Sequence, residues 1–195
     1  MTIVDHLEQH LGLIEEAWST DAADNKAPLN VVRLPGGPLA GCKVFATVGL
    51  SLHELKCPRS STLIRQELVF LAANSFGDQN VPGLLQQVGR EALESHTALL
   101  RGDVLGPRGR LFQDGEMEAL YVSVPAYFPE SFAAFTPQEG LTIVIAWLVP
   151  VTAGEAAFVT RFGWSAFEDN LASSQPDLCD PTRPGLFVNE RLRSE

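Results

Sequence analysis

Ser51 is the residue whose neighbours most suggest chemistry, because it lies in residues 49–53 (GLSLH), directly after a predicted strand. This order resembles the nucleophile elbow G-x-S-x-G, in which a tight turn presents a serine to a histidine base. Here His53 replaces the last glycine, and Pro58 prevents the long helix that an elbow requires. A serine hydrolase using Ser51, with His53 or His96 as base, is therefore an alternative; we favour a strand that ends in a polar turn.

Two groups of residues have spacings that could hold a metal ion. Residues 53–57 (HELKC) resemble the helix of zinc proteases, with Cys57 in place of the second histidine, and His6 and His10 lie one helical turn apart. Neither group has an obvious third ligand, and the chain lacks a phosphate loop and a dinucleotide glycine fingerprint. We therefore expect no metal and no cofactor, with His6 and His10 on a solvated helix flank.

Glu67 and Glu155 are lone carboxylates beside apolar sequence. Paired carboxylates can act as general acid and base, but nothing in the sequence brings these two together. Glu155 follows Thr152 with the spacing of a capping box, and the alternation around Glu67 places its side chain on the outer face of a strand. We therefore predict no catalytic residue and no enzyme.

The excess of acidic over basic residues narrows the class of binding partner that we expect. The 195 residues include 14 Lys and Arg against 24 Asp and Glu, a formal net charge of −10, which repels nucleic acid and anionic membranes. Arg101, Arg108 and Arg110 lie in a segment rich in glycine and proline, which favours a solvated turn over a basic patch. We expect a protein partner, and an acidic surface suits a basic one.

Cys42, Cys57 and Cys179 are isolated, which argues against a disulfide framework and against a structural zinc site. The longest apolar run is shorter than the roughly 20 residues that span a bilayer, and the first residues show neither a basic region nor a cleavage pattern. We therefore expect a cytoplasmic protein with no membrane contact.

A central strand is predicted at Leu141–Pro150, because its apolar run does not alternate and both of its faces must be covered. Pro150 should end the strand, and the capping box then starts a helix over Ala153–Phe162. The periodicity predicts further elements: helices over 3–18, from Asn80 to Gly102 and from Ser165 to about Ser173, and strands over 29–34, 42–50, 63–72, 110–112 and 119–124. The fold class is α+β, a single domain over 1–195 with a mixed or largely antiparallel central sheet flanked by helices.

The connection Pro125–Glu139 carries four aromatic residues, which are Tyr127, Phe128, Phe132 and Phe135. A loop with this many rings has two interpretations. It folds back as a lid over the core, or it presents an aromatic surface to a partner.

Four short segments together are similar to the suppressor-of-fused domain. They are Thr47–Ser51, Glu67–Phe70, Leu148–Pro150 with Glu155 after it, and Asp180–Pro184, and their order and separation fit from about Gly41 to Leu186. The residues that match the family pattern are Gly49, Ser51, Glu67, Glu155, Asp180 and Arg183. We interpret these residues as structural. Gly49 meets a requirement of the backbone conformation, Glu155 caps a helix, and a contact between Asp180 and Arg183 holds the tail segment in place.

The resemblance implies a single α+β domain without enzyme activity. In animals the family binds and restrains a zinc-finger transcription factor in Hedgehog signalling, and a second, C-terminal domain, which we do not expect in this chain, helps to clamp the peptide ligand. Bacterial single-domain members are thought to act as immunity proteins that neutralise a toxin by binding it. We therefore expect a bacterial protein-binding domain of this immunity type. A self-associating structural protein is a further alternative, and the partner, the binding face and the oligomeric state stay open.

Overall fold

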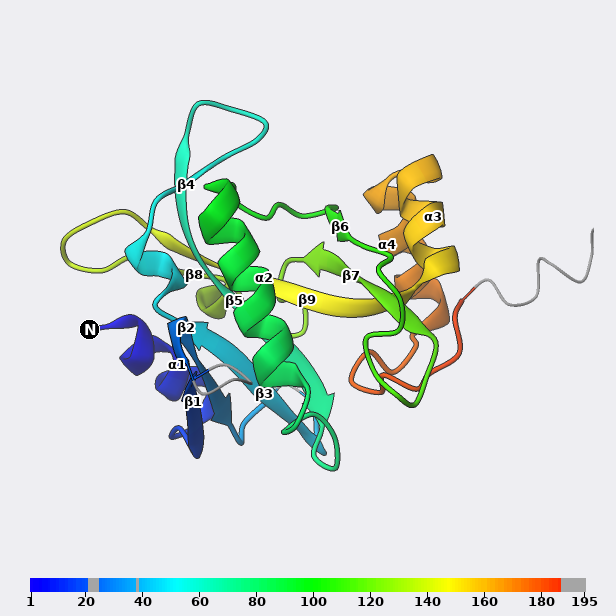
Figure 1. Cartoon of the computed structure of the whole chain (residues 1–195), viewed down its shortest axis with the longest axis horizontal. Coiled ribbons are helices and arrows are strands. Elements are labelled where there is room, and N and C mark those ends of the chain that lie inside the picture. The colour runs from blue at the N-terminus through cyan, green and yellow to red at the C-terminus, as the bar shows by residue number, and fades with distance from the viewer. Residues whose placement is uncertain (21–24, 38, 187–195) are drawn as a thin grey trace, which may run out of the picture. The chain divides into compact units, whose positions relative to one another are not determined.

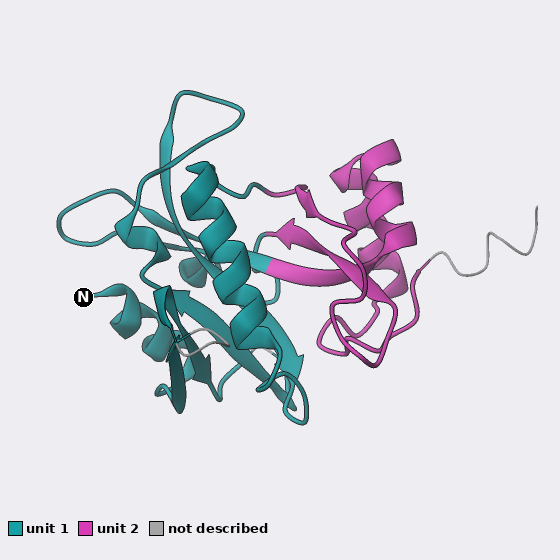
Figure 2. Cartoon of the chain, viewed as in Figure 1, with its two compact units in different colours: residues 1–100, 124–147 teal, residues 101–123, 148–195 magenta. Residues whose placement is uncertain are grey.

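A mixed, mostly antiparallel sheet with helices beside it forms the framework of the chain, as expected from the sequence (Figure 1). The computed structural model describes residues 1–20, 25–37 and 39–186. It divides into two compact units: unit 1 is Met1–Leu100 with Val124–Trp147, and unit 2 is Arg101–Ser123 with Leu148–Glu195 (Figure 2). The α+β class is confirmed, and the single domain over 1–195 stays a prediction.

Unit 1 contains most of the sheet. Its strands lie side by side in the order β1 (Glu16–Thr20), β2 (Lys26–Leu34), β3 (Cys42–Val48), β5 (Leu63–Ala73) and the first half of β9 (Ile143–Thr152). Neighbours pair antiparallel, except that β5 and β9 run parallel, with Arg65 opposite Ile143 and Val69 opposite Trp147. Two short strands extend this sheet: β4 (Leu55–Lys56) pairs with β5, and β8 (Ala134–Phe135) pairs with β9.

Helix α1 (Ile3–Leu11) starts at a capping box in which Thr2 and Asp5 satisfy each other's backbone amides. The predicted helix over 3–18 was too long. The helix ends at Gly12, and Trp18 lies in strand β1, where its ring contacts Phe45 at 5.9 Å between centroids. Apolar spacing cannot separate a helix from a following strand when both bury residues on the same side.

Helix α2 (Val81–Ser95) packs on β2, β3 and β5 and covers that side of the sheet (Figure 1). It begins with Pro82 in its first turn, but Asn80 makes no side-chain capping bond. The predicted end at Gly102 was wrong, because His96 turns into the left-handed region at φ 50°. The chain then pairs with β4, where Ala98 N donates to Lys56 O at 2.9 Å and Lys56 N donates to His96 O at 2.8 Å.

Strand β9 runs to Thr152, straight through Pro150, where the sequence predicted its end. The pairing with β5 stops at Trp147, so the missing amide of Pro150 removes no bond from that ladder. The carbonyl oxygen of Pro150 instead accepts a hydrogen bond from Arg183 Nη2 at 3.2 Å. The expected burial of both faces is confirmed, because nearly every residue of β9 is buried.

Unit 2 holds the second half of β9 with β7 (Met117–Ser123) and β6 (Val104–Leu105) beside it, in that order. Helix α3 (Ala153–Phe162) packs against β6, β7 and α4 (Trp164–Ser174). The helix predicted over 153–162 is confirmed with its capping box. Helix α4 begins at Trp164, with Gly163 as its N-cap, rather than at Ser165, and the strand predicted over 110–112 does not form.

Within the described ranges, no helix is long and apolar enough to cross a membrane.

Candidate functional site

Glu67 of β5 is fully buried, and its carboxylate accepts hydrogen bonds from residues at the end of β3 and just after it. Thr47 Oγ1 donates to Glu67 Oε2 at 2.5 Å, and Gly49 N donates to Oε1 at 3.0 Å. Ser51 donates to the same Oε1 twice, from its amide at 3.0 Å and from its Oγ at 2.6 Å. The expected outward position of Glu67 was wrong, because both faces of β5 are covered here. We call Thr47, Gly49, Ser51 and Glu67 the carboxylate knot.

Burial raises the pKa of Glu67, and the hydrogen bonds from Ser51, Thr47 and Gly49 act in the opposite direction. Among the residues that the structure describes, Glu67 has no cationic partner. Gly49 adopts φ 115°, which lets its amide turn toward the carboxylate at no steric cost. The knot therefore fixes the turn from β3 into the short 3-10 helix Leu50–Leu52.

This geometry does not favour a nucleophilic serine. Ser51 is only 3% exposed, and its hydroxyl donates to a carboxylate rather than to an imidazole. His53 and His96 are both exposed, and neither is hydrogen-bonded to Ser51 in the described part of the chain. Residues 53–57 do not form the helix of a zinc protease, because strand β4 begins at Leu55.

Glu155 of α3 forms a second buried centre, with Arg183. Arg183 Nη1 and Nη2 donate to the two carboxylate oxygens at 2.7 and 3.0 Å, a bidentate pair. The same carboxylate accepts from Thr152 N at 2.8 Å and from Leu186 N at 3.1 Å. The predicted cap at Glu155 is present, and Glu155 also binds the C-terminal segment to the start of α3.

The expected contact between Asp180 and Arg183 is made by the backbone, where Arg183 N donates to Asp180 O at 3.3 Å, and the two side chains bind other groups. The Asp180 carboxylate accepts from the amide and hydroxyl of Thr182, at 2.8 and 2.7 Å, and so closes its own turn. The guanidinium of Arg183 reaches Glu155 instead, where a buried carboxylate offers two oxygens in one plane. The tail is therefore held by Glu155, and Asp180 shapes the turn that delivers Arg183.

The aromatic connection folds back on the core. Phe132, Phe135 and Phe128 are 0%, 4% and 9% exposed, and the rings of Phe128 and Phe132 lie 4.3 Å apart. The lid interpretation therefore fits these three rings, because they are buried and are not exposed to a partner. Tyr127 alone of the four is well exposed, at 40%, with its ring 5.1 Å from that of Trp147. An aromatic binding surface in this loop is thus reduced to Tyr127.

His6 and His10 lie under this lid, and the expected solvated flank was wrong for His6. His6 is 3% exposed, its ring is stacked against Phe132 and Phe135, and its Nε2 lies 3.1 Å from Phe132 O. Burial lowers the pKa of His6, and the nearby His10 adds to this effect. Across the described ranges, no three His, Cys, Asp or Glu side chains come together as a metal site would need.

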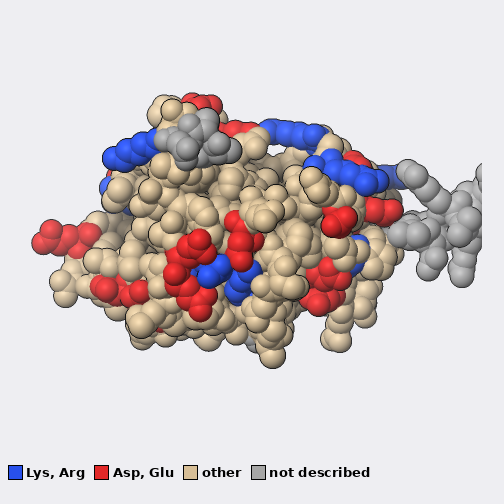
Figure 3. Space-filling model, turned by 60° about the horizontal axis from the view of Figure 1, so that its bottom comes forward, with Lys and Arg blue, Asp and Glu red and all other residues tan. Residues whose placement is uncertain are grey.

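The charged side chains of unit 1 form mixed clusters. Arg33 pairs with Glu15, Glu16 and Asp78 at 3.0–3.2 Å, and Asp78 also binds Lys43 at 2.8 Å. Figure 3 shows such mixing on one face of the molecule, where acidic and basic side chains are interspersed and the basic ones form no broad patch.

Sequence reasoning missed an exposed aromatic group in unit 2. Phe162, at the end of α3, is 54% exposed, and Trp164, at the start of α4, is 37% exposed. Arg101 lies over the Trp164 ring at 4.3 Å and Arg161 over the Phe162 ring at 4.9 Å. The available signal was the pair of aromatics on either side of Gly163, where a chain reversal keeps both from turning inward.

Comparison with known proteins gives one family. Residues 25–184 match the model of Suppressor of fused protein (SUFU). A protein described as a SUFU homologue from Neisseria gonorrhoeae has a similar structure, with a TM-score of 0.73, 13% identity and 94% of both chains covered. The Sufu–Fu complex matches with a TM-score of 0.69 and 19% identity, over 97% of this chain and 93% of that one. Drosophila Suppressor of Fused matches with a TM-score of 0.68 and 18% identity; this chain spans 52% of its length. No curated protein matches.

Proposed function

Since the chain belongs to the suppressor of fused family, we propose that it is a non-enzymatic domain that acts by binding another protein. The family match over residues 25–184 carries this proposal. The Sufu–Fu complex shows that a protein of this fold has been captured with a protein partner. The comparison structures are below 20% identical to this chain, so they supply the fold and no contact residues.

The geometry of the family-pattern residues supports this proposal. Ser51, Glu67, Glu155 and Arg183 are at most 4% exposed, and their hydroxyl, carboxylate and terminal guanidinium groups are hydrogen-bonded within the chain. Such residues hold a shape and do not meet a substrate. The recognition surface must then be made by exposed side chains.

The finer proposal is that the partner is a toxin and that this chain is a bacterial, cytoplasmic immunity protein. The similarity to the Neisseria homologue over 94% of both chains supports a bacterial relative of the same size. A net charge of −10 speeds the encounter with a basic partner, and salt then slows the association.

Neutralisation in cells tests the toxin proposal. Each gene adjacent to this one is expressed alone in a heterologous host and then together with this chain. We expect one product that stops growth alone and is harmless with the intact chain. A matched variant with Leu52→Ala, which changes a side chain that is 77% exposed, provides a surface control. If no adjacent product is toxic, or if the chain rescues none, the immunity role is contradicted and the broader binding role is not.

The hydrolase alternative has a direct chemical test. A fluorophosphonate probe labels an activated serine, and we expect no labelling because the Ser51 hydroxyl is buried against Glu67. Labelling that disappears in Ser51→Ala would establish the hydrolase instead. Light scattering tests self-association separately, and a stable homo-oligomer would support the structural alternative.

A further inference from the structure

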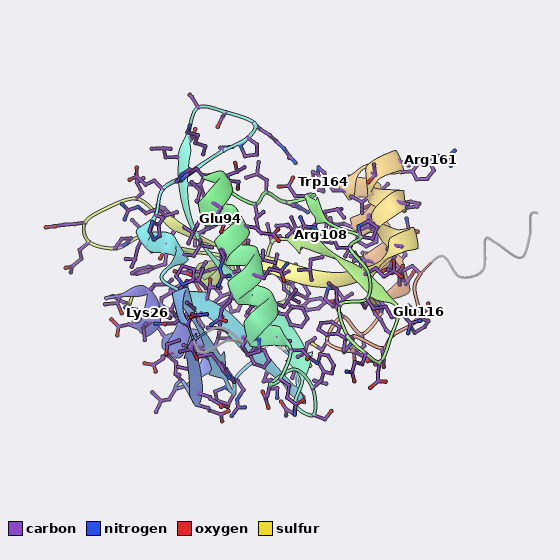
Figure 4. The ribbon with its side chains drawn as sticks, in the orientation of Figure 1. Lys26, Glu94, Arg108, Glu116, Arg161 and Trp164 are labelled. Carbon is purple, nitrogen blue, oxygen red and sulfur yellow. The ribbon has the colours of Figure 1, made fainter. Side chains whose placement is uncertain are left out.

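Five residues of unit 2 form two contact groups beside the turn between α3 and α4, which together we call the aromatic–arginine corner. In one group Arg101 lies over Trp164, and in the other Arg161 and the half-exposed Phe158 contact Phe162. Phe162 and Trp164 are 54% and 37% exposed, and the rings of Phe158 and Phe162 lie 4.7 Å apart. Figure 4 shows Arg161 and Trp164 at the same end of the α3–α4 pair.

The corner is held in place by the fold. Gly163 adopts φ 86°, so the chain reverses between the two helices and leaves an aromatic side chain on each side. Gly102 lies so close to Trp164 that an added Cβ would be 2.7 Å from its Cδ1. Arg101 stacks on the indole and pairs with Glu168, with Nε 3.0 Å from Oε1, and Tyr121 donates to that oxygen at 2.7 Å.

The residue types of the corner are typical of the centre of a protein–protein interface. Trp and Arg are enriched among the residues that dominate binding energy, and an aromatic ring under a guanidinium offers apolar area and a fixed positive charge together. Because the stacking holds the side chains before binding, less conformational entropy is lost on association.

The charge of the corner specifies the partner. Arg101 is paired with Glu168, but Arg161 makes no ion pair with any residue that the structure describes. An incoming carboxylate can therefore bind Arg161 while an apolar side chain covers Phe162. A nucleic acid fits less well, because Glu168 and Asp169 lie on the adjacent helix and the chain carries −10 overall. A second copy of the chain meets the same overall repulsion.

We propose that the aromatic–arginine corner docks an acidic, apolar segment of a protein partner. This inference rests on the proposed protein-binding function but not on the partner being a toxin. The net charges of the two molecules act over a distance and are separate from this local contact. A partner that is basic overall can therefore still present an acidic, apolar segment to the corner.

Selection from a random peptide library tests the corner, with the intact chain as bait and a labelled single-stranded oligonucleotide as a second probe. We expect enriched peptides that combine Asp or Glu with Leu or Phe. Arg161→Glu and Phe162→Ala should each weaken their binding by about tenfold or more, the scale of an interface hot spot. The matched controls Arg110→Glu and Leu52→Ala, at exposed sites elsewhere, should leave it within about twofold, as neutral contacts do.

Thermal unfolding first shows that all four variants keep the parent fold. Enriched peptides without acidic residues, peptides that bind Arg161→Glu as tightly as the parent, or binding of the oligonucleotide alone would overturn the proposal. A dimer in sedimentation that Phe162→Ala abolishes would also overturn it, because a second copy then covers the corner. Any of these results leaves the neutralisation test in cells unaffected, so failure of the corner and failure of the toxin proposal are distinguishable.

Discussion

Glu67 and Glu155 show two ways of burying a carboxylate at the scale of the residue. Glu155 has a cation, since Arg183 binds both of its oxygens. Within the described part of the chain, Glu67 accepts from neutral donors only, namely two amides and two hydroxyls. Removing a partner from a buried group costs far more than the net worth of the bond, because the group that remains loses its solvation without compensation. Both centres are therefore sensitive points of stability.

Replacement of Glu67 by Gln should destabilise the fold. The amide NH2 of Gln would face the Thr47 hydroxyl that now donates at 2.5 Å, and the buried hydroxyl proton would lose its acceptor. We expect a loss of about 1–3 kcal/mol in the free energy of unfolding, measured by urea titration. Glu54→Gln is the control, because Glu54 forms only an exposed pair with Arg65 and its loss should cost under about 1 kcal/mol. Equal effects from the two variants would contradict a structural role for the knot.

Replacement of Arg183 by Met should be more damaging. Glu155 is 0% exposed and would be left as a buried charge without its cation, a change that costs about 3–5 kcal/mol. The double variant Glu155→Gln with Arg183→Met should recover part of the loss, since it removes the stranded charge. Chemical denaturation of the single and double variants measures this coupling. A double variant as unstable as the sum of the two single variants would show that the pair does not act as a unit.

His6 should make stability depend on pH. Its pKa is lowered from 6.5 in the folded chain, so below that pH the unfolded chain takes up a proton that the folded chain refuses. The contribution of neutral His6 to the free energy of unfolding is complete above about pH 6.5, and it is lost as the pH falls toward the lower pKa of the folded chain. The midpoint of urea unfolding should therefore drop from pH 7.5 to 5.5 by more in the parent than in His6→Gln. The exposed His53→Gln should behave like the parent, and a parent curve parallel to that of His6→Gln would contradict the assignment.

The elements show which parts of the fold sequence patterns can predict. Helix α3 was predicted at its true bounds, because the capping box of Thr152 and Glu155 marks its start within four residues of chain. The end of α2 was missed because apolar spacing continues past Ser95, and the chain leaves the helix to pair with β4. Local signals fix helix starts, and pairings with distant strands decide where this helix ends.

The aromatic connection is the element whose two interpretations the structure separates most clearly. Phe132→Ala should cost about 3–5 kcal/mol in unfolding free energy, since the ring is fully buried beside Phe128 and His6. Tyr127→Ala removes a ring that is 40% exposed and should cost markedly less. Thermal unfolding of the two variants makes the comparison. A Phe132 variant as stable as the parent would mean that this segment is not the lid over the core.

At the scale of the whole molecule, the family could be identified from the sequence, but the proposed binding surface could not. Four short segments in fixed order identified the family, because buried centres such as the carboxylate knot constrain both residue type and spacing. The contacts inside those centres were beyond the sequence: Arg183 reaches Glu155 across 28 positions, and the expected Asp180 partner lies only three away. Exposed groups such as Phe162 and Trp164 follow no periodicity, so they emerge only from the structure.

The charge of the whole molecule predicts a salt-dependent association with the proposed basic partner. A chain of −10 attracts a basic protein over a distance of about one Debye length, roughly 10 Å at 0.1 M salt. Raising the salt concentration should therefore slow the association rate and change the dissociation rate much less. Surface plasmon resonance with the native partner measures both rates. An association rate that is constant across salt concentrations would show that the net charge has no part in recognition.

Purification of the tagged chain from its native cells, over a series of salt concentrations, tests the central claim most directly. The account predicts a protein that is recovered at close to one copy per chain at low salt and is lost as salt rises. Recovery of no protein near that ratio at any salt concentration, together with fluorophosphonate labelling of Ser51, would contradict it.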